Sequence, residues 1–588
     1  MTNRIIITSA AVLLAGCAVK QPPQTSSVHA TAPMPVYDVV IRGGMIYDGS
    51  GAAPQVGDVV INGDRIVAVG GPAAKARGRS EIDARGLAVA PGFINMLSWA
   101  NVALMADGRG QSDVRQGVTL EVMGEGESMG PWNPEMKRLA TERQGDIRYD
   151  VTWTSLGQFL EFLERKGVSP NVASFVGATT VREHELGEKD IDPTPAQLGR
   201  MRALVRQAMH EGAMGVGSSL IYAPANFAET PELVALASEA GRCGGMYISH
   251  IRDEGPRLIE AIDELITISE QSGAPAEIYH FKQSGRDNWG KIDAAIARVE
   301  AARARGLKIT ADMYTYPASS TGFDAAFPLW IQDGGIEQWV TRLGNSKQRA
   351  RALGEMRRPQ ASENTKLVVQ EPDKVILVGF KTEALKPLTG RTLADVARER
   401  GKSPEETAAD LIVEDGTRIQ VVYFGMKEEN VARAATLPWI SFGSDAAAMA
   451  TEGVFLKSST HPRAYGNFAR LLGKYVRDEK RVPLTEAIRR LTSLPASNLK
   501  IADRGNLRPG YYADLAIFDP ATIADTATFG KPQQYAVGMR HVLVNGVAVL
   551  RDGEHTGATP GQFVRGPGYG RCKEGSRPAA GSARGERG

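Results

Sequence analysis

Two short stretches that each end in a histidine place the strongest constraint on the fold of this chain. Residues 245–250 and 275–280 each contain a few strand-forming residues followed by His250 or His280, and a helical pattern at residues 255–272 separates them. A strand, a helix and a second strand in this order form a βαβ unit. The two strands are therefore expected to be parallel neighbours with their C-terminal ends on one face.

The two histidines have two interpretations. In a (β/α)8 barrel the C-terminal face of the strands holds the active site, and two imidazoles delivered there suit one metal ion. Alternatively, both are core histidines that hydrogen-bond to backbone. The chain has only eight histidines, and their occurrence at matching strand ends favours the metal site.

Length and charge limit the classes of protein that the chain can represent. A chain of 588 residues is too long for one hydrophobic core, so two or three domains are expected. It has 69 lysines and arginines against 67 aspartates and glutamates. This balance gives no indication of nucleic-acid binding, and no nucleic-acid partner is expected.

The hydrophobic pattern predicts an α/β fold in which one domain is inserted into another. Asn62-Gly63 and Asn545-Gly546 each separate two apolar strand-like runs, which is a strong hairpin signal. Residues 36–90 and 500–562 are therefore expected to form one small β-sandwich domain from both terminal regions. Between them, residues 91–499 alternate strand-like and helical runs, and they are expected to form a (β/α)8 TIM-like barrel.

Two further segments break this pattern. The stretch at about residues 321–433 is long and irregular, and we expect an inserted subdomain there. Residues 565–588 are rich in Gly, Arg and Ser and poor in apolar residues, which predicts a disordered tail.

The first residues have the pattern of an export signal. Arg4 precedes a short apolar run at residues 5–14, which leads into Leu14-Ala15-Gly16-Cys17. This is typical of a secretory signal, and the last four residues resemble a bacterial lipobox. Residues 1–17 are therefore predicted to be a lipoprotein signal peptide that leaves Cys17 lipidated, and residues 18–35 a flexible tether. The alternative is an ordinary cleaved signal peptide with an incidental cysteine.

The signal also predicts where the protein acts. We expect it in the bacterial periplasm, with a lipid in the inner leaflet of the outer membrane as its only membrane contact. The remaining cysteines, Cys243 and Cys572, stand before a buried-looking strand and in the tail. A disulfide framework is not expected from them.

A series of motifs follows the same order as in a known family. They include Pro91-Gly92-Phe93-Ile94, residues 217–224, Ser249-His250, His280-Phe281-Lys282, Gly443-Ser444-Asp445 and residues 461–466. With these motifs, residues 37–553 resemble the amidohydrolase superfamily, specifically its D-aminoacylase (N-acyl-D-amino-acid deacylase) branch. The resemblance implies a metal-dependent enzyme that acts on a small-molecule amide.

The chain departs from this branch on its first two barrel strands. Such enzymes usually carry Asp-x-His-x-His on strand one, but Leu97 and Trp99 stand where the two histidines would be. On strand two, Gly126 takes the place of a cysteine ligand. A neighbouring carboxylate could substitute as an oxygen ligand. Glu125 is favoured over Glu127 because its flanking glycines allow the loop to turn it inward, and the alternative is that both are solvated.

The resemblance implies a role for each candidate site residue. Glu125, His250 and His280 would hold one Zn²⁺ ion per chain, and Asp445 would carry the proton from the attacking water to the leaving amine. Without such a role, Asp445 would be a helix N-cap. The residues that match the binding site for the substrate carboxylate are Tyr222, Lys282, Ser319 and Arg463. For Tyr222 and Ser319, simple packing roles are the alternative.

The expected reaction is hydrolysis of the amide bond of N-acyl amino acids, particularly D-enantiomers, or of small peptides with D-residues. The departure at strand one leaves two alternatives open. One is a lipoprotein that keeps the barrel, has lost turnover and serves as a binding or scaffold protein. The other is an amidohydrolase that opens lactones or cyclic amides.

Overall fold

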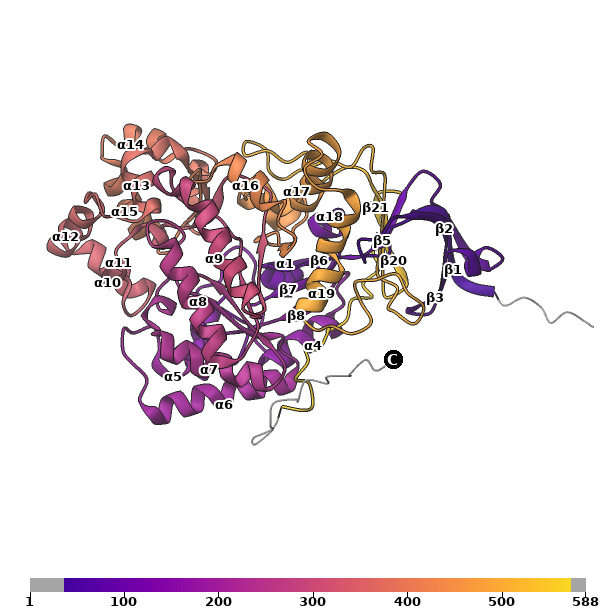
Figure 1. The fold of residues 1–588 in the computed structure, drawn as a ribbon. Coiled ribbons are helices and arrows are strands. Elements are labelled where there is room, and N and C mark those ends of the chain that lie inside the picture. Colours follow the sequence, from indigo (N-terminus) through magenta and orange to yellow (C-terminus); the bar gives the residue numbers. More distant parts are fainter. Residues whose placement is uncertain (1–35, 573–588) are drawn as a thin grey trace, which may run out of the picture.

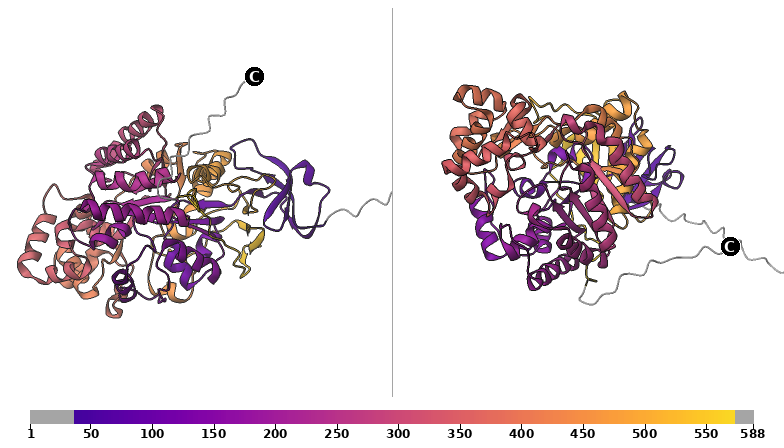
Figure 2. Two further views of the ribbon diagram at one scale, coloured as in Figure 1. Left: turned by 90° about the horizontal axis from the view of Figure 1, so that it is seen from below. Right: turned by 60° about the vertical axis from the view of Figure 1, so that its left-hand side comes forward.

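The computed structural model describes residues 36–572. The predicted signal peptide, lipidation at Cys17 and tether lie outside the described residues, as does the chain from residue 573 onward. Within residues 36–572, a barrel lies between a β domain and an insertion, which occupy opposite ends of the molecule (Figures 1 and 2).

Parallel strands form the barrel, and they pair in chain order. They are β6 (Phe93–Asn95), β7 (Val118–Met123), β8 (Asn171–Ser174) with its continuation β9 (Val176–Gly177), β10 (Gly215–Ser219), β11 (Met246–His250), β12 (Ala276–Ile278), β13 (Ile309–Met313) and β17 (Ile440–Phe442). The ring closes between its last and first strands, where Met96 N donates to Phe442 O at 3.2 Å and Ser98 pairs with Ala446 in parallel. The barrel predicted from the alternating pattern is therefore present.

Amphipathic helices cover the outside of the barrel. The ring includes α4 (Leu156–Lys166), α5 (Ala178–Leu186), α6 (Pro195–Glu211), α7 (Thr230–Arg242), α8 (Leu258–Ser272), α9 (Ile292–Ala304) and α18 (Leu484–Leu491). In α8, the residues Leu258, Ile262 and Leu265 recur at helical spacing and are buried in the main core. This apolar stripe explains why residues 258–272 form a helix packed on the strands.

The β domain combines both terminal regions, as predicted. Its strands are β1 (Val36–Ile46), β2 (Gln55–Asn62), β3 (Arg65–Val69), β4 (Arg77–Asp83), β5 (Ala88–Pro91), β18 (Leu515–Phe518), β19 (Met539–Val544), β20 (Val547–Arg551) and β21 (Glu554–His555). They are hydrogen-bonded as one continuous nine-stranded sheet in which β1 pairs with β2, β4 and β5. The two Asn-Gly pairs connect β2 to β3 and β19 to β20, where Asn545 adopts φ +49°.

The insertion between β13 and β17 has its own sheet and core. The antiparallel strands β14 (Ser319–Gly322), β15 (Val375–Gly379) and β16 (Gln420–Tyr423) pack with helices between α10 (Leu329–Gln332) and α15 (Pro404–Asp415) around a separate apolar cluster. The following helix α16 (Glu428–Ala434) contributes Val431 to the barrel core instead. Barrel packing therefore resumes before residue 433.

The C-terminal segment corrects two expectations. Cys243 and Cys572, which are 329 residues apart, form a disulfide. Residues beyond 564 are also ordered as far as residue 572, because they run along the barrel: Gly566 N donates to Gly212 O at 2.8 Å, and Gly570 N donates to His210 O at 3.0 Å. Composition could not predict this, because the order comes from backbone hydrogen bonds and a long-range covalent link.

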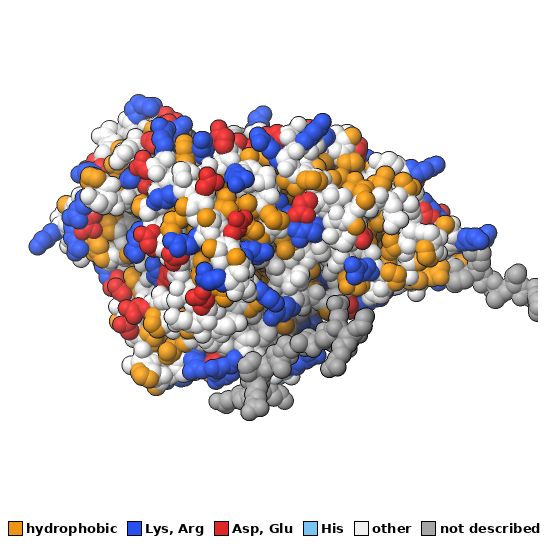
Figure 3. All heavy atoms as spheres, viewed as in Figure 1, with side chains coloured by type: hydrophobic (Ala, Val, Ile, Leu, Met, Phe, Trp, Pro, Cys, Tyr) orange, Lys and Arg blue, Asp and Glu red, His pale blue; other side chains and the backbone are white. Residues whose placement is uncertain are grey.

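The surface mixes charges of both signs. On the face shown in Figure 3, basic and acidic side chains are interspersed, in keeping with the net charge of +2. Among residues 36–572, none of the helices has the length and apolar character that crossing a bilayer requires.

Candidate metal centre and active site

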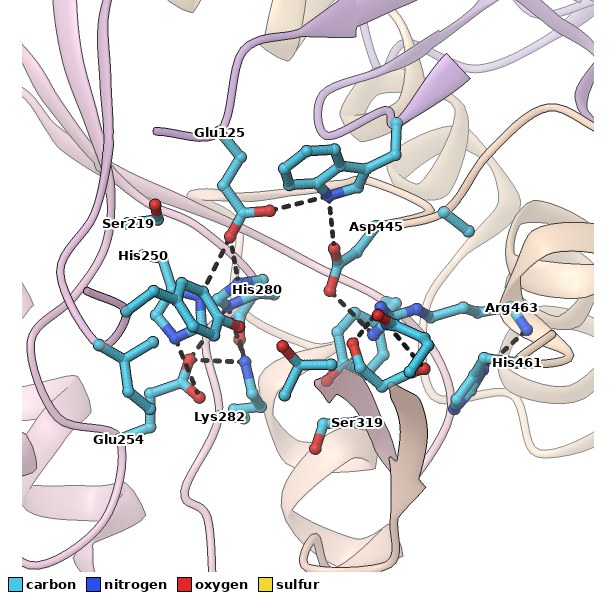
Figure 4. Close-up of a pocket in the computed structure, with 18 of the residues that line it drawn as sticks. Glu125, Ser219, His250, Glu254, His280, Lys282, Ser319, Asp445, His461 and Arg463 are labelled. Carbon is cyan, nitrogen blue, oxygen red and sulfur yellow. Dashed lines mark hydrogen bonds and ion pairs between the residues drawn. The ribbon is translucent and has the colours of Figure 1, made fainter. Parts of the chain in front are cut away.

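A cavity of about 370 Å³ lies at the C-terminal ends of the barrel strands, beneath the insertion. All eight site residues predicted from the sequence line it: Glu125, Tyr222, His250, His280, Lys282, Ser319, Asp445 and Arg463. They come from seven different segments of the chain, of which only His280 and Lys282 share one. Figure 4 shows the labelled members of this set pointing into one shared space.

Glu125, His250 and His280 form a compact group at the floor of this cavity. Glu125 Oε1 lies 3.1 Å from His250 Nδ1 and 3.0 Å from His280 Nε2. All three side chains are buried, and their ligand atoms lie within 4.8 Å of one another. Two imidazole nitrogens and one carboxylate oxygen are a donor set that zinc accepts when it keeps an open position. The residues present therefore fit a catalytic zinc ion.

The loop after β7 explains why Glu125 reaches the two histidines. Gly124 and Gly126 adopt φ of +103° and +71°, a region that favours glycine. A Cβ on Gly126 would lie 1.9 Å from Ser219 Oγ, and one on Gly124 would lie 2.3 Å from Phe175 O. A cysteine cannot occupy position 126 without displacing Ser219, so the carboxylate of Glu125 is the available ligand on this loop. Glu127, the alternative, is exposed.

Electrostatics in this group favour an ionised carboxylate beside charged or metal-bound imidazole. Burial opposes charge on Glu125, but its contacts with His250 and His280 hold its pKa below the ordinary value. For His280, burial and Lys282 oppose protonation, yet Glu254 and Glu125 outweigh them and raise its pKa to about 10. Burial lowers the pKa of His250. Because a protonated imidazole cannot ligate, a metal ion bound here would have to displace the proton of His280.

Glu254 is a site residue that the sequence reasoning did not assign. Its Oε1 accepts from Lys282 Nζ at 2.5 Å and lies 3.1 Å from His280 Nδ1, while its Oε2 lies 3.7 Å from His250 Nε2. This carboxylate faces the nitrogens of both histidines that point away from Glu125. Such partners fix the tautomer and orientation of metal-binding histidines. Its position four residues after His250 was the signal that could have identified it.

Asp445 follows β17 and points toward the same group (Figure 4). Its Oδ2 lies 2.8 Å from Arg463 Nη1, and its Oδ1 accepts from Trp99 Nε1 at 3.2 Å. Burial raises the pKa of Asp445 and the Arg463 guanidinium opposes that rise. A largely buried carboxylate with a raised pKa is suited to taking and returning a proton.

The backbone is strained at two of these residues. His280 and Asp445 adopt φ of +37° and +48°, although neither is a glycine. His and Asp tolerate this left-handed region better than most residues, but it still costs energy and is concentrated at functional sites. His280 stands two residues after the end of β12 and Asp445 three residues after the end of β17, and both side chains line the cavity.

The four residues expected to bind the substrate carboxylate differ in their present partners. Lys282 is paired with Glu254, and Arg463 with Asp445. The Arg463 guanidinium also lies 4.4 Å from the centre of the Tyr314 ring. Tyr222 packs edge-on against His250, with ring centroids 5.1 Å apart. Ser319, the first residue of β14, brings the insertion to the cavity wall.

Comparison with known proteins identifies the family. A model described as "Amidohydrolase family" matches residues 80–550. The chain belongs to this family. Within it, N-acyl-D-aspartate deacylase from Alcaligenes xylosoxydans xylosoxydans is 32% identical over 545 residues, which cover 90% of this chain and 95% of that protein.

Two solved structures share the whole architecture of this amidohydrolase. One, from a study titled "The functional role of the binuclear metal center in D-aminoacylase. One-metal activation and second-metal attenuation", is 31% identical with a TM-score of 0.74 and covers 90% of this chain and 100% of its own. The other is N-acyl-D-glutamate deacylase from Bordetella bronchiseptica complexed with zinc and a phosphonate inhibitor. It is 28% identical with a TM-score of 0.73 and the same coverage.

Proposed function

We propose that this amidohydrolase cleaves the amide bond of N-acyl-D-amino acids with the help of one zinc ion held by Glu125, His250 and His280. The observation that carries the proposal is the joint placement of this three-ligand group and Asp445 in one cavity. The deacylases that resemble the chain along nearly its full length support the choice of substrate class.

The residues of the chain have distinct tasks in this reaction. When bound, zinc would polarise the scissile carbonyl and lower the pKa of a water molecule toward about 7. Asp445 accepts the proton of the attacking water at a carboxylate oxygen and returns it to the leaving amine. Breaking the amide then yields a carboxylate and a free amino acid. Glu254 holds His280 through its Nδ1 so that Nε2 faces Glu125.

The substrate carboxylate is assigned to the basic side of the cavity. Arg463 and Lys282 are buried cations there, and a guanidinium binds a carboxylate through two parallel hydrogen bonds. Arg463 Nε has no hydrogen-bond partner among the described residues, so it retains donor capacity for a ligand. Tyr222 and Ser319 supply hydroxyl groups in the same cavity.

We also propose that the protein works as a periplasmic lipoprotein anchored at Cys17. The apolar run and the lipobox-like Leu14-Ala15-Gly16-Cys17 carry this proposal. The Cys243–Cys572 disulfide supports it, because disulfides persist in oxidising compartments such as the periplasm. With these two cysteines paired, Cys17 is the third and last cysteine of the chain.

A panel of N-acetyl-D- and N-acetyl-L-amino acids tests the proposed activity. The wild-type protein is expected to release free D-amino acid, and His280→Ala is expected to release none. His555→Ala, which changes a histidine of the β domain, serves as the matched control and should keep the activity. Absence of turnover in all three proteins would overturn the proposal and favour a binding protein without hydrolysis. Equal rates on both enantiomers would overturn the D-specificity alone.

A further inference from the structure

Trp99 contacts both acidic groups of the active site, although an indole cannot ligate a metal ion. Its Nε1–H donates to Glu125 Oε2 at 3.0 Å and to Asp445 Oδ1 at 3.2 Å. One N–H is thus shared by the carboxylate of the metal group and by the carboxylate assigned to proton transfer. In Figure 4, dashed lines join Glu125 and Asp445 to one shared indole nitrogen.

Backbone hydrogen bonds place Trp99 beside Asp445. Trp99 N donates to Ala446 O at 3.0 Å, and Asp445 N donates to Leu97 O at 2.8 Å. These bonds continue the pairing that joins the first and last barrel strands. The backbone of Trp99 is therefore held beside that of Asp445 at this seam of the barrel.

The position of the indole N–H has an electrostatic consequence. Two carboxylates that face each other need positive charge between them, from a cation that bridges them or from a hydrogen-bond donor. In this structure the donor between them is Trp99 Nε1, from which Glu125 Oε2 and Asp445 Oδ1 both accept. Leu97, the other residue after β6 that stands in place of a histidine, is fully buried and apolar. It therefore offers no metal ligand.

We infer that Trp99 takes the place of a second, bridging cation and holds Glu125 and Asp445 in position, so that the active site has room for one metal ion. This inference rests on the proposed function. It makes Trp99 a positioning residue that acts through the two carboxylates. Because the N–H is covalently part of the chain, the orientation of Asp445 does not depend on the metal concentration.

Metal counting and kinetics together test the inference. Protein stripped of metal is incubated with about tenfold excess zinc, desalted, and its zinc measured by elemental mass spectrometry. Wild-type protein is expected to retain one zinc per chain, and the double variant Leu97→His with Trp99→His is expected to retain two.

The kinetic test uses Trp99→Phe, which removes the N–H but keeps a ring. This variant should lower kcat about tenfold with KM changed by less than about twofold. Trp289→Phe, which loses an indole hydrogen bond to Gly425 O outside the site, should match wild type.

The outcomes separate this inference from the proposed function. Two zinc ions in the wild-type protein, or an unchanged kcat in Trp99→Phe, would overturn the inference even if hydrolysis is observed. One zinc in the wild type without hydrolysis would overturn the proposed function while the metal count supports the single-ion site. No zinc in the wild type would overturn both. If the double variant does not fold, the zinc content of the wild-type protein and the kcat of Trp99→Phe still test the inference.

Discussion

At the scale of single residues, this site is built from charges that balance one another inside a buried cavity. Glu125 faces two imidazoles, Glu254 faces Lys282, and Asp445 faces Arg463. Removing one residue of such a pair leaves the charge of the other residue buried without compensation, which is costly. Substitutions here are therefore expected to change chemistry and metal binding rather than only the shape of the cavity.

Replacement of Asp445 tests the assigned proton carrier. Asp445→Asn keeps the size of the side chain but cannot accept a proton, so kcat for an N-acetyl-D-amino acid should fall by about 10²–10⁴-fold, with zinc content unchanged. Asp373→Asn, an exposed aspartate of the insertion, is the control. A variant at 445 with wild-type kcat would exclude this carboxylate from the reaction.

The pH profile tests the pairing of Asp445 with Arg463. Asp445 must be ionised to accept a proton, so activity is lost as pH falls through its pKa. Burial raises that pKa above the ordinary 3.8 and Arg463 lowers it. Arg463→Met should therefore shift the acid limb of kcat/KM to higher pH, whereas Arg463→Lys retains the charge and should shift it less. Superimposable acid limbs in all three proteins would argue against the pairing.

Glu254 is predicted to support the metal ligands without contacting the metal. Glu254→Gln removes the charge that faces His280 Nδ1 and His250 Nε2, and zinc affinity should fall by about 10–100-fold, as for other partners of ligating histidines. Competition with a fluorescent chelator measures this affinity. Glu260→Gln, an exposed residue of α8, should bind zinc like wild type, and equal affinities in all three would refute the role.

At the scale of elements, the site depends on what stands at the end of each strand. The position of His250 and His280 could be predicted because a βαβ unit fixes the ends of its two strands. The choice of Glu125 over Glu127 followed from its flanking glycines. Glu254 could have been assigned from its spacing of four residues after His250. Trp99 could not, because its role arises from a contact with Asp445, which is 346 residues away in the chain.

The glycine loop after β7 offers a test at this scale. In Gly126→Ala, the new Cβ would meet Ser219 Oγ at 1.9 Å on a backbone with φ +71°, so stability should fall by about 1–3 kcal/mol or more and zinc should bind weakly. Gly187 has φ +68°, but a Cβ there would have no atom within 4 Å. Gly187→Ala should therefore lose only the stability that an alanine loses by adopting a positive φ. Chemical denaturation compares the two, and equal losses would mean that the contact with Ser219 is unimportant.

At the scale of the whole molecule, long-range links join the chain ends to the barrel. The two-domain plan could be predicted from matching strand patterns at both ends, whereas the Cys243–Cys572 disulfide could not. The two cysteines lie 329 residues apart. No local sequence pattern indicates that the C-terminal segment returns to the end of α7.

The disulfide should affect stability and leave catalysis unchanged. Cys243 follows α7 and precedes β11, at the end of the barrel opposite to the C-terminal strand ends that form the site. Replacing both cysteines by serine should lower the free energy of unfolding by about 2–5 kcal/mol, with kcat unchanged. Thermal unfolding with and without reductant measures this, and reductant should affect only the wild type. Identical unfolding of both proteins would show that the bond contributes no stability.

The central claim is that one metal ion, held by Glu125, His250 and His280, supports hydrolysis of N-acyl-D-amino acids. The most direct measurement is the rate of hydrolysis of one such substrate as zinc is titrated into metal-free protein. The rate is expected to rise linearly, to reach its plateau at one equivalent per chain, and to stay at background in His250→Ala. A rate that requires two equivalents, or equal activity in His250→Ala, would contradict the account.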